Sequence, residues 1–188
     1  MIVSIHQPNF FPWYPFFQKM ENSDVFVILQ NCQYEKNNFQ NRFNLDERWY
    51  TMSVNKGLEP IVDKRYVNYV KDWSTIKKSL HTYRNVLDMF DDCIQENLAA
   101  TNLCIIQKIH SLLNLKTKIV EDHPTELSST ERLVDLCKRH KATTYFAGSS
   151  GSSYMDLTLF ESNNIRVIFQ DPNTSTKLPI LKILKEKL

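Results

Sequence analysis

The chain has 188 residues, of which 42% are hydrophobic and 23% charged, proportions typical of a folded globular protein and too apolar for a disordered one. Its 23 basic and 21 acidic residues give a formal net charge of +2 and are spread along the sequence, so no continuous basic face for a stable nucleic-acid complex is indicated. No apolar run approaches the roughly 18 residues that a membrane span needs.

The N-terminal apolar run has no basic region before it and stops at His6, so it does not fit a secretory signal. The four cysteines, Cys32, Cys93, Cys104 and Cys137, lie far apart, without a Cys-x-x-Cys pair or a histidine at zinc-ligand spacing. We therefore expect reduced core or surface thiols, no metal site and a cytoplasmic address.

The first elements form a strand–helix–strand unit. An apolar strand over residues 2–5 is followed by a helix over residues 13–22, in which Pro15 fits the first turn. The apolar run over residues 25–29 has the length of a fully buried strand. Parallel pairing with a right-handed crossover follows.

Residues 30–56 are rich in amides and interleaved with aromatic side chains. This composition is too polar for a core and too aromatic for a flexible linker, so we predict an ordered ligand loop over about residues 30–48, leading to a strand over residues 49–54. Ordered loops of this kind often form ligand walls.

The rest of the chain alternates helical and strand patterns. The expected elements are a helical segment over about residues 73–115 with an acidic break at 88–92, a strand at 116–120, a capped helix beginning within 125–133, a strand at 143–147, a turn at 148–153, a helix at 154–160, a strand at 165–169 and, from Lys177, a loop ending in a short amphipathic helix. These elements predict one α/β domain over residues 1–188, a Rossmann-like three-layer sandwich with a mostly parallel sheet and inserted helices.

The end of the first expected strand carries the candidate catalytic residues His6, Gln7 and Asn9. In open α/β sheets, ligands bind at the carboxyl ends of the strands. An imidazole there can act as acid or base near neutral pH, and the two amides offer donors and acceptors to a polar ligand. The alternative is a histidine that only hydrogen-bonds backbone beneath the proline-rich turn.

The amide-rich loop carries a second group of candidates, Tyr34, Lys36, Gln40, Asn41 and Arg42. A guanidinium fork can hold a phosphate or carboxylate, and flat rings can stack on a sugar or base. The same spacing also fits a surface loop that is merely rich in amides.

Two of the three glycines lie in the run Gly148-Ser-Ser-Gly-Ser-Ser, between an expected strand and an expected helix. Such a run presents backbone N–H groups and the positive end of a helix to an anion, which makes Gly148, Ser149 and Tyr154 candidate ligand contacts. It has no P-loop lysine and does not fit Gly-x-Gly-x-x-Gly, and a turn that needs positive φ explains the glycines equally well.

Together these segments resemble the WbqC-like protein family, whose members often open with a strand ending in His-Gln-Pro, an aromatic-Pro-aromatic turn and a helix leading to a second strand. The matching segments are His6–Trp13, Ser23–Leu29, Tyr34-x-Lys36, Gln40–Arg42, Trp49–Val54, Tyr145–Gly148 and Tyr154–Asp156. The chain departs from the family pattern at Gln30-Asn31, where an acidic residue is often found.

The resemblance implies an enzyme of bacterial surface-polysaccharide biosynthesis, the pathway of O-antigen and lipopolysaccharide. The implied activity is that of a transferase that moves an acyl or aminoacyl group, such as glycyl, to the amine of a nucleotide-linked amino sugar. The donor would be an acyl-CoA or an aminoacyl-tRNA, the latter met only transiently, and the chain could form a homodimer.

In such a reaction His6 would deprotonate the amine, because only a neutral amine attacks a carbonyl, and Gln7 and Asn9 would orient the carbonyl or the sugar hydroxyls.

For the substrate, Arg42 and Lys36 would hold the diphosphate, and Tyr34 or Trp13 would stack on a ring.

Two rival functions remain. The opening also follows the order of a nucleotidylyltransferase, whose His-x-Gly-His would fall on Phe10–Trp13, but both histidines are missing. The other rival is a non-catalytic accessory protein that binds a sugar nucleotide.

Overall fold

The computed structural model describes residues 1–171 and 178–187 and separates the chain into two units. Of the described residues, unit 1 takes 1–6, 15–29 and 115–171, and unit 2 takes 7–14, 30–114 and 178–187. The single domain expected over residues 1–188 stays a prediction.

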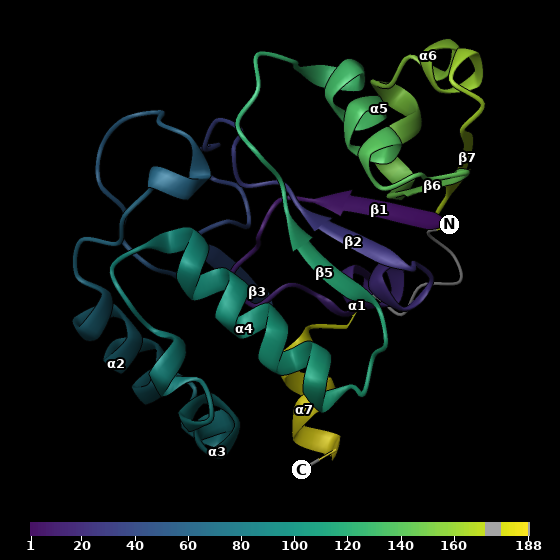
Figure 1. Ribbon diagram of the computed structural model, residues 1–188. Coiled ribbons are helices and arrows are strands. Elements are labelled where there is room, and N and C mark those ends of the chain that lie inside the picture. The colour runs from purple at the N-terminus through teal and green to yellow at the C-terminus, as the bar shows by residue number, and fades with distance from the viewer. Residues whose placement is uncertain (172–177, 188) are drawn as a thin grey trace. The chain divides into compact units, whose positions relative to one another are not determined.

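A five-stranded sheet forms the centre of unit 1, in the order β5-β2-β1-β6-β7 (Figure 1). Its strands are β1 (Ile2–His6), β2 (Val25–Ile28), β5 (Lys118–Glu121), β6 (Thr144–Ala147) and β7 (Arg166–Phe169). All neighbouring strands pair in parallel, as the apolar runs joined by helices predict. The α/β class and the parallel sheet are therefore confirmed.

Helices cover both faces of this sheet. The helices of unit 1 are α1 (Tyr14–Glu21, of which Tyr14 belongs to unit 2), α5 (Ser129–Arg139) and α6 (Leu157–Ser162). Because side chains alternate along a strand, Val3 and Ile5 point to one face, where they share a core cluster with α5 and α6. On the opposite face Phe26 packs against Phe16 of α1, with ring centroids 4.9 Å apart. This arrangement gives the three layers of a Rossmann-like sandwich.

Unit 2 contains a hairpin within the segment predicted as a loop. Its strands are β3 (Arg42–Leu45) and β4 (Arg48–Thr51), which pair in an antiparallel ladder. The two residues between them, Asp46 and Glu47, have φ angles of 50° and 63°, the conformation of a two-residue type I′ turn. That turn usually contains Asn-Gly or Asp-Gly, and the absence of this signal explains why the sequence reading placed β3 in a loop.

The helical segment of unit 2 is divided into more pieces than predicted. It contains α2 (Tyr69–Ser79), α3 (Arg84–Asp88) and α4 (Leu98–Leu112), with short 3₁₀ turns at Ile61–Asp63, His81–Tyr83 and Asp91–Cys93. The break expected near residues 88–92 is present, but a second one follows α2. At its end Leu80 has φ −106° and ψ 45°, which is not helical backbone.

Two smaller expectations concern helix ends. The helix expected to begin with a cap within residues 125–133 starts at Ser129, and Ser128 before it makes no capping hydrogen bond with its side chain. The predicted C-terminal helix is α7 (Ile180–Lys187), which buries Ile180, Leu181 and Leu184. Lys177, the expected start of the tail, lies outside the described residues.

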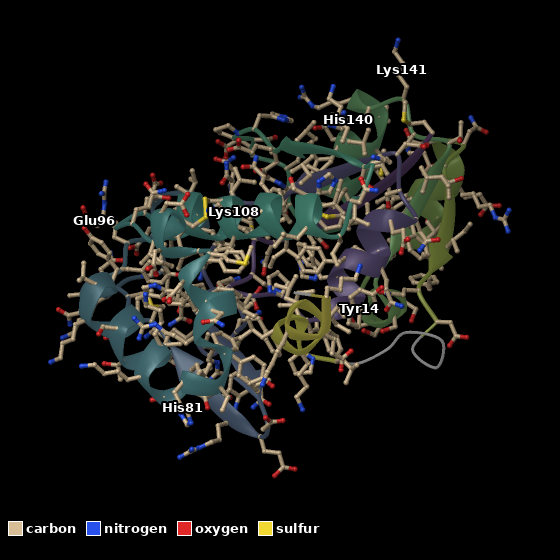
Figure 2. The ribbon with its side chains drawn as sticks, turned by 90° about the horizontal axis from the view of Figure 1, so that it is seen from below. Tyr14, His81, Glu96, Lys108, His140 and Lys141 are labelled. Atoms are coloured by element: carbon tan, nitrogen blue, oxygen red, sulfur yellow. A yellow bond between two sulfur atoms is a disulfide. The ribbon has the colours of Figure 1, made fainter. Side chains whose placement is uncertain are left out.

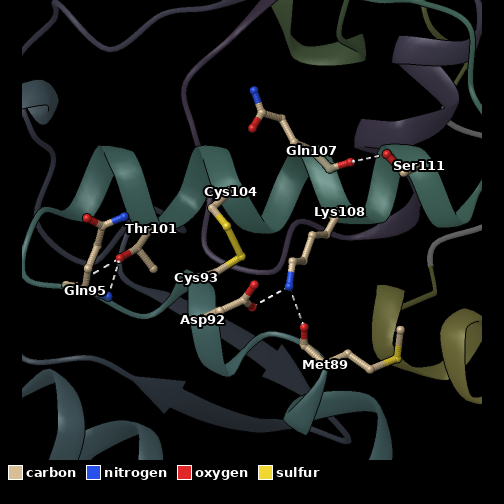
Figure 3. Close-up of a disulfide and its surroundings, with 9 residues drawn as sticks. All are labelled: Met89, Asp92, Cys93, Gln95, Thr101, Cys104, Gln107, Lys108 and Ser111. Atoms are coloured by element: carbon tan, nitrogen blue, oxygen red, sulfur yellow. Dashed lines mark hydrogen bonds and ion pairs between the residues drawn. A yellow bond between two sulfur atoms is a disulfide. The ribbon is translucent and has the colours of Figure 1, made fainter.

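A disulfide in unit 2 joins Cys93 to Cys104 (Figure 3). The bond links the 3₁₀ turn before α4 to α4 itself, while Cys32 and Cys137 are free. The prediction of reduced thiols is thus wrong for two of the four cysteines. Nothing in the local spacing marks this pair, because the fold of the segment between them brings the two thiols together.

Candidate functional site

The carboxyl edge of the unit 1 sheet has the topology of a ligand site. From β1 the chain proceeds to β2 and β5 on one side and to β6 and β7 on the other, so the topological switch point lies between β1 and β6. The ladder of these two strands ends at the pair Val3 and Tyr145. Beyond it, the Ser4 hydroxyl donates to the Phe146 carbonyl over 2.7 Å. His6 ends β1 at this edge.

The imidazole of His6 is partly buried on the α1 face of the sheet. It meets the Phe16 ring edge-on, with ring centroids 4.9 Å apart and an interplanar angle of 71°. Close to it in the chain, the Ile5 carbonyl accepts a hydrogen bond of 2.8 Å from the Nζ of Lys19. Burial lowers the pKa of Lys19 to about 7. Unit 1 thus holds an imidazole at the strand end and a lysine that titrates near neutrality beneath β1.

The glycine-rich run forms a 3₁₀ turn over Ser149–Ser153 instead of a positive-φ turn. Gly148 has φ −66°, and Gly57, in unit 2, is the glycine of the described chain with positive φ. Gly151 serves packing, since a Cβ there would meet the Met155 side chain at 2.8 Å. Gly148 and Ser149 follow β6 at the carboxyl edge, and Tyr154 is 64% exposed. The positive-φ explanation is therefore wrong.

Unit 2 contains a polar cavity of about 570 Å³, a volume within the range of small-molecule sites. We call it the cationic pocket. Its lining residues are Tyr34, Lys36, Asn37, Asn41, Arg42, Thr51, Val54, Asn55, Lys56 and Gly57. Three of these side chains are basic and, in the described part of the chain, none is acidic, so the pocket favours an anion.

Arg42 is held in this pocket by the hairpin. It stands on β3 opposite Thr51 of β4, and its Cζ lies 4.1 Å from the centroid of the Trp49 ring. Its Nη2 donates to the Asn37 carbonyl, while its buried Nε–H has no hydrogen-bond partner. A stacked guanidinium is pre-oriented and less hydrated than an ammonium, which suits phosphate recognition.

Lys36 and Lys56 are exposed and form no ion pair within the described ranges 1–171 and 178–187. Their charges are therefore free to meet an anionic ligand. Lys56, Thr51, Asn55 and Gly57 also line the pocket and were not among the predicted ligand contacts. The available sequence signal was Gly57 itself, one of three glycines in the chain, because glycine adopts a φ such as the 115° found here at least cost.

Two predicted contacts, Tyr34 and Asn41, line the pocket and also hold its wall together through hydrogen bonds. Tyr34 is 3% exposed, and the Nζ of the buried Lys64 covers its ring at 4.6 Å. Its hydroxyl donates to Asn41, which donates in turn to the Met52 carbonyl. Burial raises the pKa of Tyr34, partly offset by Arg42. Tyr34 therefore forms a wall of the pocket and has no free face for stacking.

Gln40 and Gln7 bond to each other. The Nε2 of Gln40 donates to Gln7 Oε1 over 2.7 Å, and Gln40 Oε1 accepts from the backbone of Glu35. Gln40 is fully buried, so it supports the loop from within. The amide of Asn9, 6% exposed, forms no hydrogen bond with any residue described. Of the predicted aromatic platforms, Trp13 is 48% exposed and keeps a free face.

Two further features bear on chemistry. Within the described residues, no group of three or more His, Cys, Asp or Glu side chains is arranged to hold a metal ion. No helix in residues 1–171 or 178–187 is long and apolar enough to cross a bilayer. The arrangement can hold a phosphorylated or carboxylated ligand in unit 2 and offers an imidazole at the sheet edge of unit 1.

The chain is similar to known proteins over most of its length. The model of the WbqC-like protein family matches residues 7–180. An uncharacterized protein of Mycobacterium tuberculosis, Rv1507c, is 27% identical over 190 residues, which cover 90% of this chain and 81% of the relative. No solved structure matches the chain. Because the family match spans most of the sequence, the chain belongs to the WbqC-like protein family.

Proposed function

We propose that this protein is a transferase that acts on a nucleotide-linked amino sugar in bacterial surface-polysaccharide biosynthesis. The observation that carries the proposal is the cationic pocket, where Lys36, Arg42 and Lys56 line one cavity and none of the described lining residues is acidic. A diphosphate presents several anionic oxygens, and hydrogen bonds between charged partners are among the strongest available to a protein. The pocket would hold that diphosphate, and the sugar would be the part that reacts.

The reaction we propose is acyl or aminoacyl transfer, for example of a glycyl group. The sugar amine attacks the donor carbonyl, a C–N bond forms, and the bond to the thiolate of coenzyme A or to the tRNA hydroxyl breaks. The amine must lose a proton, and His6 is the proposed general base because an imidazole accepts protons near neutral pH. The leaving group takes up the proton that His6 releases.

Calorimetry with nucleotide diphosphate sugars tests the binding step. Replacing Lys36 and Lys56 together by alanine removes two of the three cations and is expected to weaken binding roughly ten-fold or more. Arg48→Ala is the matched control, since Arg48 is an exposed cation on the same hairpin outside the pocket. Equal losses in both variants would indicate a general charge effect and sink the assignment.

The catalytic step needs its own test. His6→Ala is expected to keep ligand binding and lose turnover, measured as acylation of the amino sugar by mass spectrometry. His81→Ala is the control, because His81 lies on the surface of unit 2 and points outward (Figure 2). Full turnover by a folded His6→Ala protein would defeat the role of His6.

A specific observation favours one alternative, a non-catalytic sugar-nucleotide-binding protein. The amide of Gln7, a candidate for orienting the carbonyl, accepts a hydrogen bond from Gln40 and donates one to Glu35, which leaves it less free to orient a reacting carbonyl. Ligand binding without turnover in wild-type protein, with every donor supplied, would favour this alternative. Binding of free nucleoside triphosphates that requires Mg²⁺ would instead favour nucleotidyl transfer.

A further inference from the structure

Unit 2 also contains a groove of about 320 Å³ with apolar walls, which we call the aromatic groove. Five aromatic side chains line it, together with Asn44 and with Pro179–Leu181 at the start of α7. Three of the rings are unusually open to solvent, with Trp13 48%, Phe39 45% and Trp49 46% exposed. Large rings are normally buried where a fold can cover them, so a cluster of exposed rings around a groove indicates a binding surface.

The polar group of the groove is the amide of Asn44. This side chain is half-buried on β3 and forms no hydrogen bond with another described residue. An amide offers a donor and an acceptor side by side, the pattern that pairs with the edge of a nucleobase. A ligand in this groove would therefore meet flat faces on its sides and one donor–acceptor pair at its edge.

The groove and the cationic pocket share one face of the hairpin. Arg42 and Asn44 lie two residues apart on β3, so both point to the same face, and across the ladder they stand opposite Thr51 and Trp49. Trp49 connects the two sites directly, because it lines the groove and carries the Arg42 guanidinium on its ring. Two residues along a strand span roughly 6.8 Å, a separation that a ribose can bridge.

We propose that the aromatic groove is the nucleobase subsite of this protein. The base stacks against the exposed rings of Trp13, Phe39 and Trp49, its edge bonds to the Asn44 amide, and its phosphates extend toward Arg42. This inference rests on the proposed function, because it places the second part of the same nucleotide ligand. It fixes the ligand's direction along the hairpin, with the base at the Asn44 end and the anion at the Arg42 end.

An acyl chain fits the groove less well than a base does. Burying the Asn44 amide under a hydrocarbon would leave its donor and acceptor without partners, which costs free energy. A hydrocarbon chain also gains little from flat ring faces, whereas every nucleobase has a flat face that can stack on them.

Calorimetry with three probes separates the subsite from the pocket: inorganic diphosphate, UDP and ADP. Wild-type protein is expected to bind at least one nucleoside diphosphate roughly ten-fold or more tightly than inorganic diphosphate. Trp13→Ala combined with Phe39→Ala should abolish this preference and leave the affinity for diphosphate unchanged. Leu58→Ala, which removes an exposed apolar side chain outside the groove, should alter neither. Trp49 is left intact because it supports Arg42.

Tryptophan fluorescence gives an independent readout. The nucleotide should quench Trp13 and Trp49, while Trp73, 5% exposed, supplies a constant background, and diphosphate alone should not quench. Nucleotides that bind no more tightly than diphosphate would overturn the subsite and leave the cationic pocket standing. Failure of all three probes to bind would overturn the proposed function and the subsite together. Quenching by octanoate but not by nucleotides would assign the groove to an apolar chain and overturn the inference.

Discussion

Lys19 makes the stability of this protein depend on pH in a way that its structure specifies. The side chain is 3% exposed and donates to the Ile5 carbonyl, and no ion pair of the described residues includes it. Burial lowers its pKa from 10.5 to about 7. Between these values the unfolded chain holds a proton that the folded chain has released, so the unfolding free energy rises with pH.

The magnitude follows from linkage. Each pH unit inside this window is worth about 1.4 kcal/mol, and because the transition at the folded pKa is gradual, the gain between pH 7 and pH 8.5 is about 1.5 kcal/mol. Above pH 8.5 two other buried groups lower the unfolding free energy and oppose the gain from Lys19. Burial raises the pKa of Cys137 to about 12 and also raises that of Tyr145. As the pH rises past the ordinary pKa values of these two groups, the unfolded chain releases protons that the folded chain keeps, so the protein loses stability.

Urea unfolding of wild-type protein and Lys19→Met at several pH values measures this contribution. Methionine keeps the size of the side chain without a titratable group, so the difference between the two proteins isolates Lys19. Far-UV circular dichroism is the suitable probe, since all three tryptophans, Trp13, Trp49 and Trp73, lie in unit 2 and Lys19 lies in unit 1. A wild-type stability that stays flat from pH 7 to 8.5, or a variant with the same slope as wild type, would refute the reasoning.

Two further predictions concern stability. The disulfide closes a short loop, with Cys93 and Cys104 separated by 11 positions. Replacing both cysteines by alanine is therefore expected to lower the unfolding free energy by about 3 kcal/mol. Urea unfolding measures this change, and unchanged stability would show that the bond is absent in solution. Gly151→Ala places a Cβ 2.8 Å from Met155 and should lower the unfolding free energy by about 1 kcal/mol. Gly148→Ala meets no atom within 4 Å and should melt at the wild-type temperature. Equal melting temperatures of the two variants would contradict the packing role of Gly151.

The alternation of strands and helices in unit 1 could be predicted because each element there is defined by its own residues. The run Val25–Ile28 is buried at every position, and a continuous apolar run of this length is typical of a parallel central strand. The structure of unit 2 depends instead on contacts between residues that are farther apart in the sequence. The hairpin turn at Asp46–Glu47 lacks the expected glycine, and the bond between Cys93 and Cys104 depends on how the intervening segment folds. Neither carries a local signal.

The disulfide also bears on the predicted cytoplasmic location. Thiol pairs in the cytosol are usually kept reduced, so Cys93 and Cys104 would remain joined mainly in an oxidising environment. Because Cys93 is fully buried, a reductant reaches the bond mainly from the side of Cys104, which is partly exposed. The oxidation state of this pair in cells, measured by thiol alkylation, would therefore report on the compartment.

The amide-rich composition of residues 30–48 indicated a ligand site, and the structure explains why only part of it faces a ligand. Buried backbone groups in an irregular segment need hydrogen-bond partners that a regular ladder would otherwise supply. The amides supply them: Gln40 bonds the Glu35 backbone, Asn41 bonds the Met52 carbonyl, and Asn102 of α4 bonds the carbonyls of Pro8 and Gln40. With the backbone held by amides, the cationic side chains and exposed rings of the same segment are left free to bind. The amides of this segment therefore serve largely as its scaffold, and the proposed ligand contacts are the residues interleaved with them.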